Sequence, residues 1–372
     1  MMHLAGLSIL MTADTVGGVW TFATALSGAL AASGVNVHLV TQGPVAGPEQ
    51  RSMLAPSVHL IESPLALEWQ DPDGSDVAAA RRFFAELQAR LAPDIVHLNG
   101  FREAAFAWGC PVVVSAHSCV NSWAIACNDG AWLSEPRWRR YTESVSLGLD
   151  RAHAWVCPTR TFYNSVRDLY RPCSPGHVVW NGIASKVGTA IQKENFVLAA
   201  GRMWDAAKNL SALAQVSDEI AWRIRVAGPA ADAAACCEGI ELLGPVSHVE
   251  LDCLMQRAAV YVSPARYEPF GLAVLEAASR GCALVLSDIP TFRELWDGAA
   301  LFVEANDVAA LRACLTRLAA DAAMRAFLQQ AALLRSRRYT LRKMADRYAA
   351  LYHNLLGADT KADLTLAAEV MA

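Results

Sequence analysis

The chain has 372 residues, of which 54% are hydrophobic and 18% are charged, and its formal net charge is −4. This length and composition indicate two folded domains of ordinary size and exclude disorder over most of the chain. The charge balance argues against a general nucleic-acid binder, and no apolar run reaches the length of a membrane span. The ten cysteines form no C-x-x-C pair, so we expect buried free thiols in a reducing cytoplasm.

Short apolar segments alternate with amphipathic ones along the first half of the chain. We expect strands at Leu4–Met11, Val35–Val40, Asp94–Leu98, Pro111–Ala116, Ala154–Cys157 and His177–Trp180. The segment before Asp14 has no basic leader, and we interpret it as the first strand rather than as a signal peptide. Apolar residues at helical spacing predict two helices between these strands, the first ended by Gly34 and the second by Pro93.

The same alternation returns in the second half, where Ser247 and Glu250 form a capping-box pattern ahead of a helix. The expected strands there are Phe196–Ala200, Trp222–Ala227, Ala259–Ser263, Ala283–Ser287 and Ala300–Val303. Alternating β and α segments with apolar strands predict an α/β protein with two doubly wound, Rossmann-like parallel sheets, whose domains would face each other across a cleft. Ligands of such sheets bind at the carboxyl ends of the strands.

A glycine-rich, polar segment at 181–194 interrupts this alternation and predicts the domain boundary. We expect a first domain at 1–182, a second domain at 183–339, a final helix at 340–356 and a tail at 357–372. The final helix carries an apolar stripe, whereas the tail after Gly357 has weak periodicity. The tail is therefore expected to lie outside the helix.

The segment from Glu268 to Glu276 places two carboxylates around a Pro-Phe-Gly-Leu junction, with seven residues between them. A strand precedes this segment and a helix follows it, so Glu268 would lie in the connecting loop. The backbone amides of Phe270, Gly271 and Leu272 would open the helix, where unpaired N–H groups favour an anion. One nucleoside diphosphate sugar could reach both carboxylates and these amides; alternatively, the two glutamates are unrelated.

Two further loops carry features of an anion site. Gly17-Gly18, between the first strand and the first helix, would let a bulky anion approach the backbone or would only form a tight turn. Arg202 and Lys208 bracket the loop after the first strand of the second domain; they would suit a diphosphate, although a solvated charge pair fits the same pattern. No G-x-G-x-x-G sequence and no Walker sequence occurs.

Four other features could have either a functional or a purely structural role. His117 and His97 end neighbouring strands; His117 would face a ligand or be structural, and we expect His97 to be a packing or supporting residue. Asp71-Pro72-Asp73 has turn chemistry, which predicts a surface turn rather than a metal site. Arg137-Trp138-Arg139-Arg140-Tyr141 could touch an anionic membrane or a lipid phosphate, but a helix with packed tryptophans and solvated arginines is favoured.

In combination these motifs resemble the retaining glycosyltransferases of family four, which have the GT-B architecture. The resemblance covers about residues 4 to 356, and its specificity lies in the order of the motifs. The matching residues are Gly17-Gly18, His117, Asn181-Gly182-Ile183, Gly201-Arg202, Lys208-Asn209, Glu268-Pro269-Phe270-Gly271-Leu272, Glu276 and Ser287-Asp288-Ile289-Pro290. The resemblance implies a retaining hexosyltransferase that uses a UDP- or GDP-sugar, with no cofactor and no metal.

The resemblance also implies roles for the residues of the second domain. Glu268 would bind hydroxyls of the donor sugar, assisted by the amides of residues 270–272, and Glu276 would bind the ribose hydroxyls. Arg202 and Lys208 would neutralise the leaving diphosphate. Gly244-Pro245-Val246 would seat the base.

In the first domain, the resemblance implies that His117 contacts the donor sugar and that Gly17-Gly18 lies against the donor phosphates or the acceptor side. The final helix would return to this domain. The acceptor would be a saccharide or lipid-linked hydroxyl in cell-surface polysaccharide or glycolipid synthesis, with peripheral contact at the inner membrane face left open.

Two departures and two alternatives accompany this interpretation. Gly228-Pro229 stands where the family often has Gly-Asp or Gly-Gly, and the acceptor loops around 119–141 match no known pattern.

The main alternative is a non-catalytic scaffold with the same fold that binds a nucleotide sugar. The second alternative is an enzyme with the same fold that catalyses sugar-nucleotide epimerisation or phosphorolysis.

Overall fold

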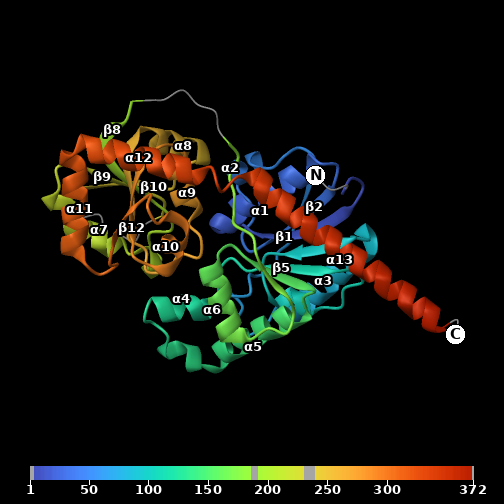
Figure 1. Ribbon diagram of the computed structural model, residues 1–372. Helices are drawn as coiled ribbons and strands as arrows, with labels where there is room; N and C mark the ends of the chain where they lie inside the picture. Colours follow the sequence, from blue (N-terminus) through green and yellow to red (C-terminus); the bar gives the residue numbers. More distant parts are fainter. Residues whose placement is uncertain (1–3, 186–191, 230–238, 371–372) are drawn as a thin grey trace. The chain divides into compact units, whose positions relative to one another are not determined.

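The computed structural model describes residues 4–185, 192–229 and 239–370, with side chains as far as Gly357. Residues 186–191 of the predicted boundary segment lie outside the described residues. The chain forms two compact units, coloured along the sequence in Figure 1. The first comprises Met1–Ser122, Gly130–Ala184 and Leu341–Ala372, and the second comprises Trp123–Asp129 and Ser185–Thr340.

The first unit is built on a seven-stranded sheet in the order β3-β2-β1-β4-β5-β6-β7, and all its neighbouring strands are parallel. Its strands are β1 (Ser8–Asp14), β2 (Asn36–Gln42), β3 (Val58–Glu62), β4 (Ile95–Leu98), β5 (Val112–Ser115), β6 (Ala154–Cys157) and β7 (Gly176–Val178). The strand order reverses between β1 and β4. At such a switch point the loops diverge and leave a place for a ligand.

Helices connect these strands, as parallel pairing requires. They are α1 (Gly18–Ala31), α2 (Pro48–Ser52), α3 (Val77–Leu91), α4 (Val120–Ala126), α5 (Pro136–Arg151), α6 (Arg160–Tyr170) and α13 (Leu341–Val370), with short 3₁₀ turns η1 (Arg102–Ala105) and η2 (Ala131–Ser134). The last helix, α13, packs against α1. The segment Trp123–Asp129, which includes the end of α4, groups with the second unit.

A buried polar network attaches α13 to the first sheet. The His97 Nδ1 lies 2.6 Å from the Tyr352 hydroxyl, and its Nε2 lies 2.7 Å from the Ser115 hydroxyl, which in turn lies 2.8 Å from the Tyr348 hydroxyl. Burial, followed by the nearby His117, lowers the pKa of His97 to about 3. His97 is therefore a neutral packing residue, as the sequence predicted.

The second unit contains a six-stranded parallel sheet in the order β10-β9-β8-β11-β12-β13. Its strands are β8 (Glu194–Ala200), β9 (Ile224–Ala227), β10 (Ile240–Gly244), β11 (Ala258–Ser263), β12 (Ala283–Ser287) and β13 (Leu301–Val303). Its helices are α7 (Leu210–Val216), α8 (His248–Arg257), α9 (Leu272–Ser279), α10 (Pro290–Trp296), α11 (Val308–Ala320) and α12 (Ala322–Ser336), with 3₁₀ turns η3 (Ala206–Lys208) and η4 (Ser217–Glu219). The switch point of this sheet lies between β8 and β11.

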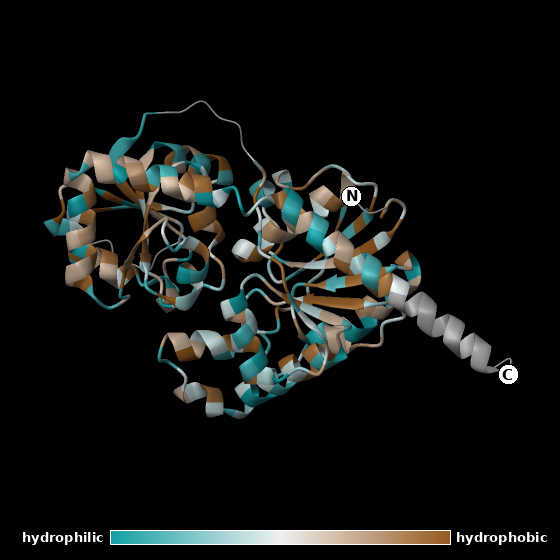
Figure 2. Ribbon diagram, in the orientation of Figure 1, coloured by the Kyte–Doolittle hydropathy of each residue, from teal (hydrophilic) through white to brown (hydrophobic). Residues whose placement is uncertain are grey.

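The predicted α/β class with two Rossmann-like parallel sheets is confirmed, and the strands of both sheets are predominantly hydrophobic in Figure 2. The sequence missed one strand at the edge of each sheet, β3 and β10. Edge strands are covered on fewer sides, and β3 alternates buried Val58 with exposed His59 instead of forming an apolar run. The final helix also continues to Val370, past the expected end at 356, because no proline follows Gly357 and alanine recurs there.

Candidate functional site

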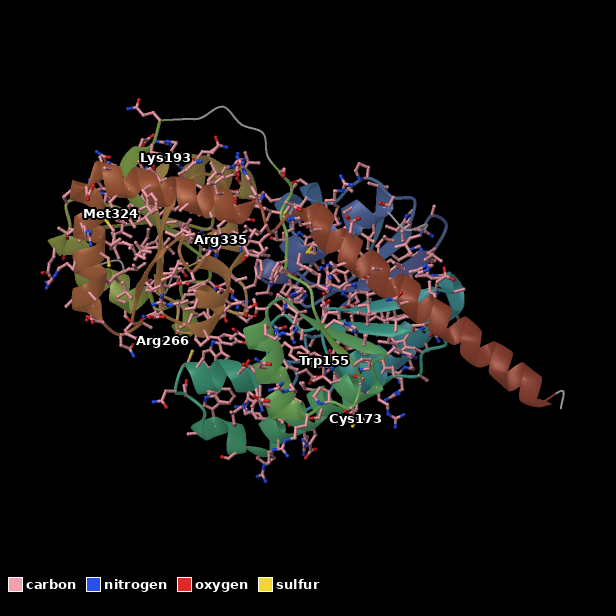
Figure 3. All side chains as sticks on the ribbon, in the orientation of Figure 1. Trp155, Cys173, Lys193, Arg266, Met324 and Arg335 are labelled. Carbon is pink, nitrogen blue, oxygen red and sulfur yellow. The ribbon has the colours of Figure 1, made fainter. Side chains whose placement is uncertain are left out.

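The switch point of the second sheet brings together the two loops that carry the predicted donor residues. Gly201-Arg202 directly follows β8, and Glu268 follows the neighbouring strand β11. Arg266, labelled in Figure 3, joins the two loops, since its backbone N–H donates to the Ala207 carbonyl at 2.8 Å and its Nη1 donates to the Ala206 carbonyl at 3.0 Å. Residues sixty positions apart in sequence therefore share one loop surface.

An ion pair lies at the centre of this surface. The Lys208 Nζ is 2.6 Å from the Glu268 Oε2, and the two side chains retain only 20% and 18% of their exposure. A half-buried pair is screened less by solvent than a surface pair. The pair holds both side chains in place at the head of α9.

Gly271 turns the chain from the Glu268 loop into α9. It is the N-cap with φ of 86°, a left-handed conformation that favours glycine. A Cβ added there would lie 3.2 Å from the Phe292 ring and 3.3 Å from the Glu268 Cγ. Phe270 is anchored against Tyr339, with ring centroids 6.0 Å apart. Within the described ranges no side chain caps this helix, and its first turn has no acidic residue, so its opening N–H groups can donate to an anion.

Both glutamates of the predicted pair lie near one buried tyrosine. Burial, followed by the negative charges of Glu268 and Glu276, raises the pKa of Tyr261. The Tyr261 hydroxyl donates to the Ala200 carbonyl at 3.3 Å, immediately before Gly201-Arg202. The structure therefore brings Glu268, Glu276 and the arginine loop to the same edge of the sheet.

Arg202 lies beside an acidic and an aromatic neighbour. Its Nη2 is 3.4 Å from the Asp205 Oδ2, and its guanidinium carbon is 5.6 Å from the centre of the Trp204 ring. In the described part of the chain, no acceptor bonds its Nε or Nη1. Those donors can form a bidentate contact with a phosphate.

Two residues support the loop: Asp205, which escaped the sequence analysis, and Asn209, which was named there only within the Lys208-Asn209 motif. Asp205 caps the η3 turn by accepting from the Ala207 N–H at 2.9 Å. Asn209 adopts φ of 56°, and its Nδ2 donates to the carbonyls of Pro264 at 3.0 Å and Ala305 at 2.7 Å. The available signal was the residue types themselves, because Asp caps helical turns and Asn tolerates the left-handed conformation.

The turn at Gly228-Pro229, where this chain departs from the family at Pro229, packs closely against the arginine loop. Gly228 has φ of 118°, and a Cβ there would lie 2.0 Å from the Gly201 carbonyl oxygen. The Pro229 carbonyl accepts from the Met203 N–H at 2.7 Å, and the Gly228 N–H donates to the Gly244 carbonyl at 2.7 Å. This turn therefore supports the arginine loop and the predicted base-binding segment at Gly244.

The remaining predicted residues belong to the first unit. Gly17, the N-cap of α1 with φ of 84°, and Gly18 are exposed after β1. Asn99 donates from its Nδ2 to the Thr12 carbonyl at 2.6 Å, which leaves its Oδ1 to accept from the His117 Nε2 at 2.7 Å. Burial lowers the pKa of His117 to about 4, so the neutral ring carries its proton on Nε2 and its Nδ1 can accept.

The Asp71-Pro72-Asp73 turn and the segment at Arg137, for which a structural role was predicted, contain side chains with bonding partners. Asp71 accepts from the backbone N–H groups of Ser75 and Asp76 and from Arg102, as expected of a turn. Within the described ranges, no group of three or more His, Cys, Asp or Glu could hold a metal ion. Arg137 pairs with Glu135 and lies over Trp138.

Comparisons with known proteins identify the class to which this architecture belongs. The family Glycosyltransferase Family 4 matches residues 16–186, and the family Glycosyl transferases group 1 matches residues 194–321. A solved structure of Anabaena Alr3699/HepE in complex with UDP-glucose has a TM-score of 0.74 at 13% identity, covering 94% of this chain and all of that one. The two parallel-sheet units are thus those of a GT-B protein.

Partial sequence similarity connects the chain with two bacterial enzymes. It is 32% identical over 111 residues to the O-antigen biosynthesis glycosyltransferase WclY of Escherichia coli, covering 28% of this chain and 30% of the relative. It is 33% identical over 121 residues to the GDP-mannose:cellobiosyl-diphosphopolyprenol alpha-mannosyltransferase of Xanthomonas campestris, covering 32% of each. The matches therefore span about a third of these relatives. The chain belongs to the glycosyltransferases of family four, group 1 type, as the sequence motifs predicted.

Proposed function

We propose that this glycosyltransferase moves a hexosyl group from a UDP- or GDP-sugar to a hydroxyl acceptor, with retention of configuration and without a metal ion. The observation that carries the proposal is the Lys208–Glu268 pair at the head of α9. It combines a cation for a phosphate, a carboxylate for sugar hydroxyls and helix-terminal amides in one place. A nucleoside diphosphate sugar presents the complementary groups.

The proposed chemistry separates charge at the bond between the sugar and the diphosphate. As the anomeric C–O bond breaks, its electron pair goes to the diphosphate oxygen, and the acceptor hydroxyl forms the new bond on the same face. The acceptor's proton goes to the leaving phosphate. Arg202, Lys208 and the opening amides of α9 would stabilise the developing negative charge, which is the work that a divalent ion does in other transferases.

The other residues would bind the ends of the donor. Glu268 would accept hydrogen bonds from the sugar hydroxyls, assisted by the amides of Phe270, Gly271 and Leu272. Glu276, four residues into α9 from Leu272, would take the ribose hydroxyls. In the first unit, the His117 Nδ1 would accept from a donor hydroxyl, and Gly17-Gly18 would admit the phosphates or the acceptor close to the backbone.

The names of the two relatives above support a saccharide or lipid-linked acceptor in the synthesis of a cell-surface polysaccharide or glycolipid. Among the described residues, no helix has the length and apolarity to cross a membrane. We propose that peripheral contact uses α5, whose Arg139 is exposed next to the partly exposed Trp138. Flotation with vesicles containing anionic lipid, compared between the wild type and Arg139→Glu, tests this part of the proposal.

The alternative is a non-catalytic scaffold that binds a nucleotide sugar. The intact Arg202, Lys208, Glu268 and Glu276 disfavour it, because a site that has lost its activity usually loses its charged residues first. Tight binding of a donor with no transfer to any acceptor in a lipid extract would favour it.

Release of UDP from UDP-glucose and of GDP from GDP-mannose, measured with a bacterial lipid extract in EDTA, tests the main proposal. We expect release of one nucleotide in EDTA, and its loss in Glu268→Ala. Proton NMR of the product should show that the transferred sugar keeps the donor's α configuration. A β-linked product would contradict retention, and full activity of Glu268→Ala would contradict the site.

A further inference from the structure

The loop between β8 and α7 exposes a tryptophan on the outward side of the site. Buried residues alternate with outward ones along this loop; the buried ones are Met203, Asp205, Ala207 and Asn209. Trp204, between the outward cations Arg202 and Lys208, is 52% exposed. A large aromatic side chain is rarely this exposed, so its position between two predicted site cations suggests a role for the ring.

The ring contacts one of these cations. The Arg202 guanidinium carbon lies 5.6 Å from the Trp204 ring centre, within the range of a cation–π attraction, for which tryptophan is the best partner. The Asp205 carboxylate is the second neighbour, at 3.4 Å from Nη2. That distance is long for a charge-assisted hydrogen bond, and the ring adds a second restraint.

Asp205 is itself fixed, so it defines the side from which Arg202 is held. Its Oδ1 accepts from the Ala207 N–H at 2.9 Å and, within the second unit, from the Trp123 Nε1 at 2.9 Å. The guanidinium group therefore contacts both a fixed carboxylate and an aromatic ring. Two contacts limit the rotamers of a long side chain more than one does.

An aromatic ring restrains a guanidinium group differently from a carboxylate. It attracts the cation through its π face, and it neither neutralises the charge nor occupies an N–H donor. Within the described ranges, the Nε and Nη1 of Arg202 have no acceptor and remain available for two phosphate oxygens. An arginine restrained in this way loses less conformational entropy when the anion binds.

We propose that Trp204 is a positioning residue whose indole face holds the Arg202 guanidinium ready for the donor diphosphate. This inference rests on the proposed function, since it requires a diphosphate ligand at Arg202. It assigns Trp204 a role through the arginine and no contact with the sugar or the base.

Calorimetric titration of the full chain with UDP and with GDP tests the inference. We expect Trp204→Ala to weaken binding of the preferred nucleotide about two- to fivefold, the range of an exposed cation–π contact. Trp204→Phe should retain most of the affinity, because it keeps a π face, whereas Trp204→Leu should behave like Trp204→Ala. Phe327→Ala removes another exposed aromatic ring, 69% exposed on α12, and should change nothing.

A double-mutant cycle distinguishes positioning from direct contact. If Trp204 acts through the arginine, Trp204→Ala should have no further effect in an Arg202→Ala background. Additive effects, full affinity in Trp204→Leu, or no effect of Trp204→Ala would each overturn the inference and leave the proposed function intact. If the wild type binds neither UDP nor GDP, the proposed function fails and the inference fails with it.

Discussion

Replacing Gly228 by alanine should destabilise the second unit and weaken donor binding together. The new Cβ would lie 2.0 Å from the Gly201 carbonyl oxygen and 3.0 Å from its carbonyl carbon, whereas real Cβ contacts are longer than 3.0 Å. The turn or the Gly201 peptide must therefore move by about 1 Å. Because Arg202 follows that peptide directly, the displacement reaches the predicted diphosphate site.

The expected cost has two parts. A non-glycine residue at φ of 118° costs about 1–3 kcal/mol, and forced overpacking adds about 1–3 kcal/mol. Gly298→Ala is the matched control, since Gly298 has φ of 77° but its nearest contact, the Arg335 Nη2, is 3.9 Å away. The difference between the two variants isolates the clash.

Thermal unfolding followed by tryptophan fluorescence measures the loss, with about 2–4 °C for each 1 kcal/mol in a domain of this size. Titration with UDP and GDP measures the effect on the site. Equal melting temperatures of the two variants, or an unchanged nucleotide affinity in Gly228→Ala, would refute the reasoning that the close approach of the Gly228 turn shapes the arginine loop.

The further predictions concern two buried histidines, a lysine that bonds two helix ends, and the ion pair of the donor site. Because the folded-state pKa values of His97 and His117 are lowered to about 3 and about 4, their contribution to stability is present above pH 6.5 and is lost as pH falls towards these values. We expect each to cost about 2–3 kcal/mol between pH 7.5 and 4.5 for urea unfolding, and His97→Gln to flatten the dependence. The Lys193 ammonium group donates to the Met255 carbonyl at 3.0 Å and to the Arg280 carbonyl at 2.7 Å, at the ends of α8 and α9. Lys193→Met leaves both carbonyls without this donor and should cost about 1–3 kcal/mol of stability. An unchanged melting temperature would contradict this. Lys208→Ala should lower sugar transfer about 10²-fold or more, and Glu268→Gln should lower it while keeping the fold, as circular dichroism would show.

The central strands of both sheets were predictable because they are buried on two faces and form continuous apolar runs. The segments Ala154–Cys157 and Ala283–Ser287 coincide with β6 and β12. The edge strands β7 and β13 were also expected, whereas the edge strand β3 alternates buried and exposed residues and was missed for that reason. The order of strands follows from neither pattern, since it depends on long-range pairing.

The pairing of Lys208 with Glu268 could be expected only from the combination of motif and fold. Their loops follow β8 and β11. These two strands are neighbours in the sheet although β9 and β10 lie between them in the sequence. Loop geometry was beyond prediction from one sequence. The contact of Arg202 with Trp204 depends on the conformation of one loop, and the left-handed Asn209 depends on its bonds to the distant Pro264 and Ala305 carbonyls, which no local pattern describes.

We propose above all that the second unit binds a nucleoside diphosphate sugar through the Arg202 loop and the Glu268 helix. A thermal-shift panel with UDP-glucose and GDP-mannose, with and without EDTA, tests this most directly. We expect stabilisation by one of the two donors that persists in EDTA and is lost in Lys208→Ala. Absence of stabilisation by either donor, or equal stabilisation of Lys208→Ala, would contradict it.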